Sequence, residues 1–162
     1  MRASCVPETQ AMRIIEDDLQ NPDVVRLLRE HLQHVASLSP PGSVHALDVQ
    51  ALQSPAVTLW TAWEEDELLG CGALQELTTE HAEIKSMRTA TAHLGTGVAS
   101  AIMRHLIDEA RSRGYVRLSL ETGSAAEFTP AQSLYRKFGF RFCEPFGAYQ
   151  EDPYSRFMTR SI

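Results

Sequence analysis

The chain has 162 residues, of which 43% are hydrophobic and 22% are charged, and this composition is typical of a folded globular domain. Its net charge of −6, without any basic run, gives no reason to expect a nucleic-acid partner. No apolar run approaches membrane-spanning length and no signal-peptide pattern opens the chain, so we expect a cytoplasmic protein without a membrane partner. Three scattered cysteines indicate a reducing compartment, and six scattered histidines lack the spacing of metal ligands, so no metal is expected.

The first elements follow a leader. Residues 1–11 are expected to form a flexible leader, and residues 12–162 a single domain. Met12–Ile15 predicts a short strand. Asn21-Pro22-Asp23 predicts the start of a helix, because it combines an N-cap residue, proline at the first helical position and an acid. The proline-rich segment Ser39–Gly42 predicts the end of that helix.

A second, shorter helix and a hairpin come next. Ser43 is expected to cap a helix that runs through Leu52 and carries His45. Two segments rich in strand formers, Val57–Trp63 and Leu68–Leu74, are separated by the charged turn Glu64–Glu67. A turn this short predicts an antiparallel pair.

The most informative stretch runs from a strand through a glycine turn into a long helix. Glu83–Thr89 suits a strand, and Val98, Ala101, Ile102, His105, Leu106 and Ala110 recur at helical spacing on one face. Gly114 suits the position just after the helix. The first N–H groups of such a helix have no internal acceptor, and with the helix dipole they favour an anion such as a phosphate.

The glycine turn leaves the anion open. No Gly-Lys-Ser/Thr follows the glycines, which argues against a Walker-type loop. Gly95–Ser100 has two glycines of a dinucleotide fingerprint, and Glu121 stands roughly where a ribose-binding acid would be. Against this alternative, the turn follows a meander late in the chain, whereas a dinucleotide fold begins with a parallel strand-helix-strand unit.

The rest of the chain predicts a mixed α/β sheet. Tyr115–Glu121 alternates, with Val116, Leu118 and Leu120 on one face, and is expected to lie parallel to the Glu83 strand. Thr129-Pro130 predicts the N-cap and first turn of another helix that ends at Gly139. Phe140–Cys143 and Ser155–Thr159 are predicted to be the last strands. We therefore expect an antiparallel meander followed by parallel crossover strands, flanked by helices.

Three segments in this order resemble the GNAT superfamily of N-acetyltransferases, in particular its small bacterial members. The segments are Glu83-Ile84-Lys85-Ser86-Met87, then Leu94-Gly95-Thr96-Gly97-Val98-Ala99, and then Ser133-Leu134-Tyr135-Arg136-Lys137-Phe138-Gly139-Phe140. The tail from Pro145 to Ser155 is also similar. Leu94 departs from the arginine or glutamine of the family signature, and Phe128 departs from a frequent asparagine.

The resemblance implies acetyl-CoA as the cosubstrate and a sheet that splays where it binds. The pyrophosphate would lie on backbone N–H groups of the glycine turn, which comprises Leu94, Gly95, Thr96, Gly97, Val98, Ala99 and Ser100. The pantetheine arm would run along the Glu83 strand and pair near Met87 and Thr89. An N–H near Met87 would polarise the thioester carbonyl.

The resemblance also implies direct attack of an amine on the thioester. Glu83 matches the base glutamate of the lysine-acetylating members, although Lys85 on the same face could instead neutralise it. Glu121 is a second candidate base, and Tyr135 matches the general acid for the leaving thiolate. His45, Arg88 and Tyr149 are candidate substrate contacts.

Other functions stay open at this point. The glycine turn and Glu121 also allow an NAD-dependent oxidoreductase, and loss of the base would leave a noncatalytic acyl-CoA-binding module. The acceptor is expected to be an amine of a small molecule or peptide. The net negative charge of the protein slightly favours an acceptor that is a cation. A homodimer is compatible with the resemblance, because many family members dimerise.

Overall fold

The computed structural model describes residues 11–162. Apart from Ala11, the expected leader therefore lies outside the described residues. The strands are β1 Arg13–Asp17, β2 Val57–Glu64, β3 Glu67–Glu76, β4 His81–Thr89, β5 Arg117–Gly123, β6 Arg141–Cys143 and β7 Ser155–Ser161. The helices are α1 Pro22–Leu38, α2 Val49–Leu52, α3 Val98–Ser112 and α4 Thr129–Lys137, with short 3-10 turns η1 Pro41–Ser43, η2 Thr91–His93 and η3 Ala126–Phe128.

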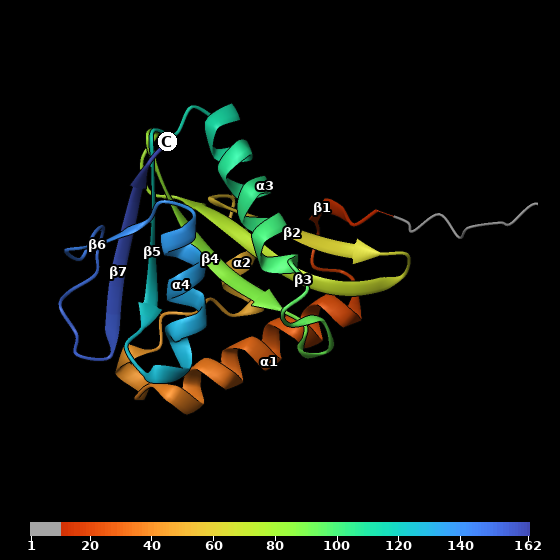
Figure 1. The fold of residues 1–162 in the computed structure, drawn as a ribbon, viewed down its shortest axis with the longest axis horizontal. Coiled ribbons are helices and arrows are strands. Elements are labelled where there is room, and N and C mark those ends of the chain that lie inside the picture. Colours follow the sequence, from red (N-terminus) through yellow and green to blue (C-terminus); the bar gives the residue numbers. More distant parts are fainter. Residues whose placement is uncertain (1–10) are drawn as a thin grey trace, which may run out of the picture.

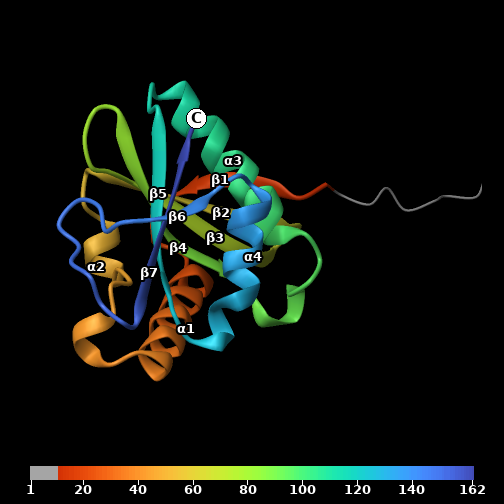
Figure 2. The same cartoon turned by 60° about the vertical axis from the view of Figure 1, so that its left-hand side comes forward.

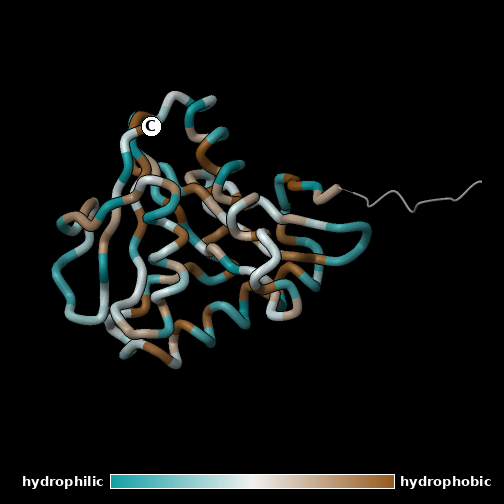
Figure 3. The backbone as a smooth tube through the Cα atoms, in the orientation of Figure 1, coloured by the Kyte–Doolittle hydropathy of each residue, from teal (hydrophilic) through white to brown (hydrophobic). Residues whose placement is uncertain are grey.

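These strands form one mixed sheet in the order β1-β2-β3-β4-β5-β7-β6. Neighbouring strands are antiparallel except for β4 and β5, which are parallel and are connected through α3 (Figure 1). The predicted meander, crossover and fold class are thus confirmed. The predicted charged turn also holds, and Figure 3 shows hydrophilic residues at the tip of the β2–β3 hairpin.

Helices cover both faces of the sheet. One core lies under α3 and α4 and includes Ile102, Leu106 and Tyr135. The other lies under α1 and α2 and includes Leu28 and Leu52. Figure 2 shows α3 and α4 on one side of the strands and α2 on the other. Full burial of one such leucine contributes about 1.5–3 kcal/mol, so both faces of the sheet are firmly held.

Local signals set the ends of two helices as expected. The Asn21 side chain accepts a hydrogen bond from the Asp23 N–H at 2.9 Å, and α1 begins at Pro22. Gly114 follows α3 with a φ of +85°. That left-handed conformation suits glycine, which has no Cβ to clash.

The prediction of a helix over Ser43–Leu52 is wrong in its first half. Ser43 ends η1, the next backbone segment is extended, and α2 begins only at Val49. Asp48 is the N-cap of α2, because its carboxylate accepts a hydrogen bond from the Ala51 N–H at 2.8 Å. The residues between η1 and α2, including His45, therefore lie on a loop rather than on a helix.

Two smaller expectations are also wrong. Val116 was expected on the same face of a strand as Leu118 and Leu120, but it is 53% exposed. It lies just before β5, where its N–H donates to Glu80 O outside the strand pairing. Thr129 is already helical rather than an N-cap, because η3 runs directly into α4 and places Phe128 at the cap position.

The sheet splits between β4 and β5. Their pairing runs from His81 opposite Arg117 to Ile84 opposite Leu120 and then stops. The pairing of β4 with β3 also shifts between Cys71 and Ala73. At this irregularity Ser86 adopts a φ of +54°, a conformation that costs a residue with a side chain about 1–3 kcal/mol. The expected splay is thus confirmed, and strained backbone lies beside it.

Candidate active site

The glycine turn offers unpaired backbone donors to solvent. Gly95 and Gly97 have φ values of +73° and +86°, and an added Cβ at either would meet nothing within 4 Å. Within residues 11–162, the N–H groups of Gly95, Thr96 and Gly97 donate no hydrogen bond. The first turn of α3 begins at Val98 and adds donors that lack an intrahelical acceptor. This arrangement fits a phosphate group.

Leu94 differs from the rest of the turn. Its N–H already points to Thr91 O over a long 3.5 Å, and its side chain is 63% exposed. Leu94 therefore offers solvent an apolar side chain where a longer polar one could reach a phosphate.

A cavity of about 110 Å³ lies at the split, and we call it the inner cavity. It brings together three predicted site residues from separate elements, namely Met87 of β4, Glu121 of β5 and Tyr135 of α4. His45 also lines it. The predicted residues Thr89 and Arg88 and those of the glycine turn, Leu94, Gly95, Thr96, Gly97, Val98, Ala99 and Ser100, are not among its lining residues.

Two further lining residues were missed from the sequence. His31 lies on α1, where nothing in the pattern distinguishes it from a surface histidine. Ser86 occupies the variable position of the Glu-Ile-Lys-x-Met segment. Its side chain is buried, and its Oγ has no hydrogen-bond partner among the described residues.

Glu121 has the chemical character of a base. Burial raises the pKa of its carboxyl to about 7, while the Ser155 hydroxyl and the Lys85 ammonium lower it and the Glu83 carboxylate raises it. A carboxyl with a pKa near 7 can be ionised at neutral pH and still accept a proton from a substrate group. Glu121 therefore suits proton transfer in the inner cavity.

Tyr135 is the hydroxyl donor of the inner cavity. It is 8% exposed and packs edge-on against Phe140 at a centroid distance of 6.2 Å. Burial, with a smaller effect of the Glu121 carboxylate, raises the pKa of Tyr135 to about 12. The phenol therefore keeps its proton at neutral pH and can donate a hydrogen bond.

Glu83 is held in a buried network. Lys85 Nζ lies 3.1 Å from Glu83 Oε2, and the Tyr149 hydroxyl donates to the same oxygen at 2.6 Å. Lys85 Nζ also donates to Tyr149 Oη and to His45 O, each at 2.9 Å. Burial and the Glu83 carboxylate raise the pKa of Tyr149. The ion pair that competes with the base role of Glu83 is therefore present.

The same network separates the inner cavity from a second hollow of about 540 Å³, the outer cavity. Lys85 and His45 line both, whereas Glu83 and Tyr149 line only the outer cavity. Glu121 and Tyr135 thus line the inner cavity together, whereas Glu83 lines the outer one.

Phe128 covers the end of β5. An added Cβ at Gly123 would come within 2.0 Å of the Phe128 ring, so glycine is required for this contact. Phe128 and Gly123 both line the inner cavity. An apolar ring thus closes the wall at the position where the resemblance led us to expect an asparagine.

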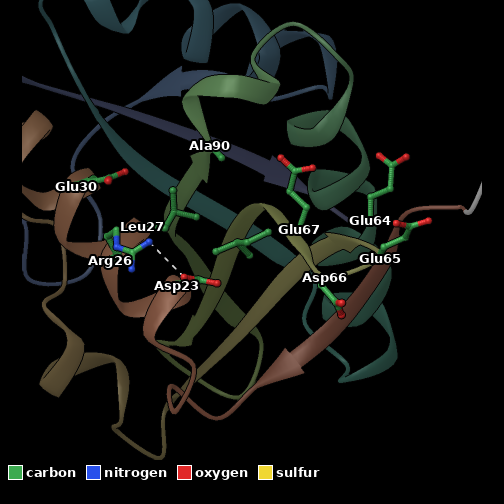
Figure 4. A pocket seen from close by; sticks show the side chains of 10 residues that line it. Asp23, Arg26, Leu27, Glu30, Glu64, Glu65, Asp66, Glu67 and Ala90 are labelled. Atoms are coloured by element: carbon green, nitrogen blue, oxygen red, sulfur yellow. Dashed lines mark hydrogen bonds and ion pairs between the residues drawn. The ribbon is translucent and has the colours of Figure 1, made fainter.

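A larger groove of about 620 Å³ lies between α1 and the β2–β3 hairpin (Figure 4). Its carboxylates are Asp23, Glu30, Glu64, Glu65, Asp66 and Glu67, and its arginine, Arg26, pairs with Asp23 at 3.3 Å. These charges repel an anionic cosubstrate. The candidate active site is therefore the inner cavity rather than this groove.

Residues 11–162 contain neither a metal-binding cluster nor a membrane-spanning helix. No group of three or more His, Cys, Asp and Glu side chains there could hold a metal ion. In the same part of the chain, none of the helices has the length and apolar character needed to cross a membrane.

A sheet split beside a glycine turn at a helix N-terminus is the arrangement that the resemblance to the GNAT superfamily implies. The Acetyltransferase (GNAT) family matches the chain over residues 22–140, and the chain belongs to this family. It is therefore an acyltransferase, which removes the oxidoreductase alternative.

Curated relatives carry the same activity in their names. The chain is 56% identical over 151 residues to the uncharacterized N-acetyltransferase YsnE of Bacillus subtilis (strain 168), covering 93% of this chain and 100% of the relative. It is 50% identical over 146 residues to the uncharacterized N-acetyltransferase YedL of Escherichia coli (strain K12), covering 90% and 92%.

Solved structures agree in fold. A GNAT family acetyltransferase from Elizabethkingia anophelis with acetyl-CoA bound has a TM-score of 0.66 at 19% identity, covering 93% of this chain and 98% of that one. A Bacillus subtilis acetyltransferase in complex with CoA has a TM-score of 0.66 at 19% identity, covering 94% and 99%. Identities this low support the fold alone.

Proposed function

We propose that the protein transfers the acetyl group of acetyl-CoA to a primary amine of a small molecule or peptide by direct attack on the thioester. One observation carries the proposal, namely that Glu121 and Tyr135 share a cavity at the split of the sheet. The new bond joins the amine nitrogen to the acetyl carbon, and the bond from that carbon to sulfur breaks. Acetyl-CoA supplies the activated acetyl group.

The residues around the split fit this cosubstrate. The free N–H groups of Gly95, Thr96 and Gly97 and the first turn of α3 would hold the pyrophosphate. The unpaired length of β4 beyond Ile84 leaves backbone near Met87 and Thr89 for the pantetheine arm. The two solved neighbours described with acetyl-CoA or CoA have this fold.

Glu121 is our proposed base. The attacking nitrogen must lose a proton, because an alkylamine with a pKa of about 10.4 is mostly protonated near pH 7. Glu121 lines the inner cavity and has a pKa near 7, whereas Glu83 is already paired with Lys85 and Tyr149. The base role of Glu83 stays a competing prediction that the ion pair weakens.

Tyr135 is proposed to stabilise the leaving sulfur. A thiol has a pKa of about 8.5, so complete proton transfer from a phenol with a pKa of about 12 is uphill by about 5 kcal/mol. A hydrogen bond from the Tyr135 hydroxyl to the thiolate avoids that cost. The thiolate takes up a proton from solvent once it has left the acyl group, and Glu121 returns to solvent the proton that it accepted from the amine.

The cosubstrate site can be tested with Gly97→Glu. Acetyl-CoA and CoA at about 100 times their Kd should stabilise the wild-type protein by about 2.7 kcal/mol in a thermal-shift titration, and NAD should not. The variant is expected to lose this shift, because like charges about 4 Å apart near a protein surface repel by about 4 kcal/mol.

Gly97→Asn is the matched control for backbone strain. Asparagine tolerates a positive φ better than most residues and adds no charge, so this variant should keep most of the shift. Equal loss in both variants would assign the effect to the backbone rather than to phosphate. Stabilisation of the wild type by NAD alone would overturn the cosubstrate assignment.

A second test replaces Tyr135 by phenylalanine. The ring and its packing remain, so stability should change little, while kcat should fall by about 10²-fold through loss of one hydrogen-bond donor. Release of free CoA, measured with a saturating amine, reports kcat. Unchanged kcat would remove Tyr135 from the chemistry, and a protein that binds acetyl-CoA without acetylating any amine would instead be a noncatalytic acyl-CoA-binding module.

A further inference from the structure

Arg88 has no ion-pair partner in the part of the chain that the structure describes. It is half-buried near the end of β4, and among residues 11–162 no carboxylate pairs with it within 4.0 Å. Its Nε is completely buried and has no hydrogen-bond partner in that part of the chain. An arginine cannot shed its proton, and a buried N–H of a charged group that has no hydrogen-bond acceptor is costly. Such a group calls for an explanation.

The surroundings of Arg88 lie on the α1 face of the sheet. Arg88 pairs in register with Cys71, which packs in the core under α1. It lies close enough to His31 to lower the pKa of that imidazole, which burial and Arg88 together bring to about 4. His31 is therefore neutral at pH 7. Arg88 does not itself line the inner cavity, but it directly follows the lining residue Met87 in β4, and its register partner Cys71 lies on the face of the sheet covered by α1, which carries the lining residue His31.

Nearby acids do not neutralise Arg88. Asp17 acts on the neighbouring Cys71, but its carboxylate accepts hydrogen bonds from the Leu19 N–H at 2.8 Å and the Thr61 hydroxyl at 3.1 Å. Lys85, which is a buried cation of the same strand, differs from Arg88, because its ammonium is already bound by Glu83 and two further oxygen acceptors. Among residues 11–162, Arg88 is thus a cation near the inner cavity that has no ion-pair partner and is available to a ligand.

A second unpaired group lies at the same place. Ser86 is 7% exposed, lines the inner cavity, and its Oγ has no partner among the described residues. Its backbone has a φ of +54°. A guanidinium and a hydroxyl that both lack partners are the groups expected where a ligand oxygen completes the site.

We propose that the acceptor amine carries a carboxylate and that Arg88, assisted by the Ser86 hydroxyl, binds this carboxylate. The inference rests on the proposed function and names its substrate class as amino acids and similar small amines. The planar guanidinium offers two parallel donors that match a carboxylate. Ser86 and Met87 line the inner cavity of about 110 Å³, and Arg88 follows them directly in β4, so a small anionic group at the edge of this cavity is within the reach of both side chains that we propose.

The test compares matched acceptors. The standard amino acids, their primary amides and their decarboxylated amines are assayed by acetyl-CoA-dependent CoA release, and kcat/KM is measured for each set. The readout is the ratio of kcat/KM for the acid to that for its amide, since damage to the fold lowers both values and cancels. For the wild type we expect a ratio of about 10 to 100 with the preferred acid.

Variants assign the preference to Arg88. Arg88→Met should bring the ratio close to one through a higher KM for the acid. Arg88→Lys should give an intermediate ratio, because lysine keeps the positive charge but lacks the two parallel N–H donors of the guanidinium. Arg111→Met, at a half-exposed arginine near the end of α3, is the control and should keep the wild-type ratio. Ser86→Ala should lower the ratio by less than Arg88→Met does.

The outcomes separate the two proposals. Acetylation of amines without any preference for a carboxylate, or an unchanged ratio in Arg88→Met, would overturn this inference and leave the proposed function intact. Binding of acetyl-CoA without transfer to any amine would defeat the proposed function, and the inference would fall with it.

Discussion

Replacement of Glu121 by glutamine is expected to lower kcat/KM by about 10² to 10⁴-fold, the range that a positioned general base contributes. The amide keeps the size and shape of the side chain but cannot accept the proton. The measurement is the rate of acetyl-CoA-dependent CoA release at a series of amine concentrations that extends to saturation, which gives kcat/KM. Glu127→Gln, at an exposed carboxylate in η3, is the matched control and should retain wild-type activity.

The pH profile should identify the same group. The pKa of Glu121 is raised to about 7, so the fraction of ionised base falls as the pH drops below 7. Wild-type log(kcat/KM) should therefore rise more steeply below pH 7 than the value for Glu121→Gln, by one additional unit of slope. Equal slopes in the two proteins would place the base elsewhere.

The pH dependence of the free energy of unfolding tests the raised pKa of Glu121 independently of activity. The folded-state pKa of Glu121 lies above its ordinary value of 4.5, so its contribution to stability is intact below pH 4.5 and is lost as the pH rises to about 7. At one pKa unit per 1.4 kcal/mol, the loss at pH 8 is on the order of 3 kcal/mol. Glu121→Gln should therefore be more stable than the wild type at pH 8 and similar to it at pH 4.5. Destabilisation at both values would indicate a structural carboxyl instead.

Local sequence signals predicted the order of elements well. Asn21-Pro22-Asp23 placed the start of α1, and the glycine turn placed the start of α3, because caps and left-handed residues act through their own backbone. Ser43 failed as a cap for a tertiary reason, since its hydroxyl donates to Asp152 from the β6–β7 connection. A contact between residues 109 positions apart leaves no local signal.

Sequence motifs and strand positions predicted part of the candidate site. The resemblance pointed to Tyr135, Met87 and the glycine turn, whereas His31 of α1 has no pattern that places it at the split. The character of Glu121 also depends on tertiary structure, because its raised pKa comes from burial. The missing partner of Arg88 is likewise visible only when all neighbouring strands and helices are in place.

The Glu83–Lys85 pair should have the largest effect on stability. Lys85→Met leaves the Glu83 carboxylate 3% exposed with the Tyr149 hydroxyl as its remaining hydrogen-bond donor among residues 11–162, and breaking a buried pair in this way costs about 3–5 kcal/mol. Lys137→Met, at an exposed lysine near the end of α4, should cost less than about 0.5 kcal/mol. Denaturant unfolding at pH 7 measures both values.

The double variant Glu83→Gln/Lys85→Met decides what Glu83 does. With both charges removed, the amide carbonyl introduced at position 83 can still accept from Tyr149, so the double variant should regain most of the stability that Lys85→Met loses. Additive losses would show that the two side chains are not coupled. The activity per folded molecule distinguishes the structural role of Glu83 from a role as the base. If Glu83 is only an ion-pair partner, kcat/KM of Glu83→Gln should stay within about tenfold of the wild-type value. A fall in kcat/KM of about 10²-fold or more would identify Glu83 as the base. Glu121 would then act only through its charge near the site.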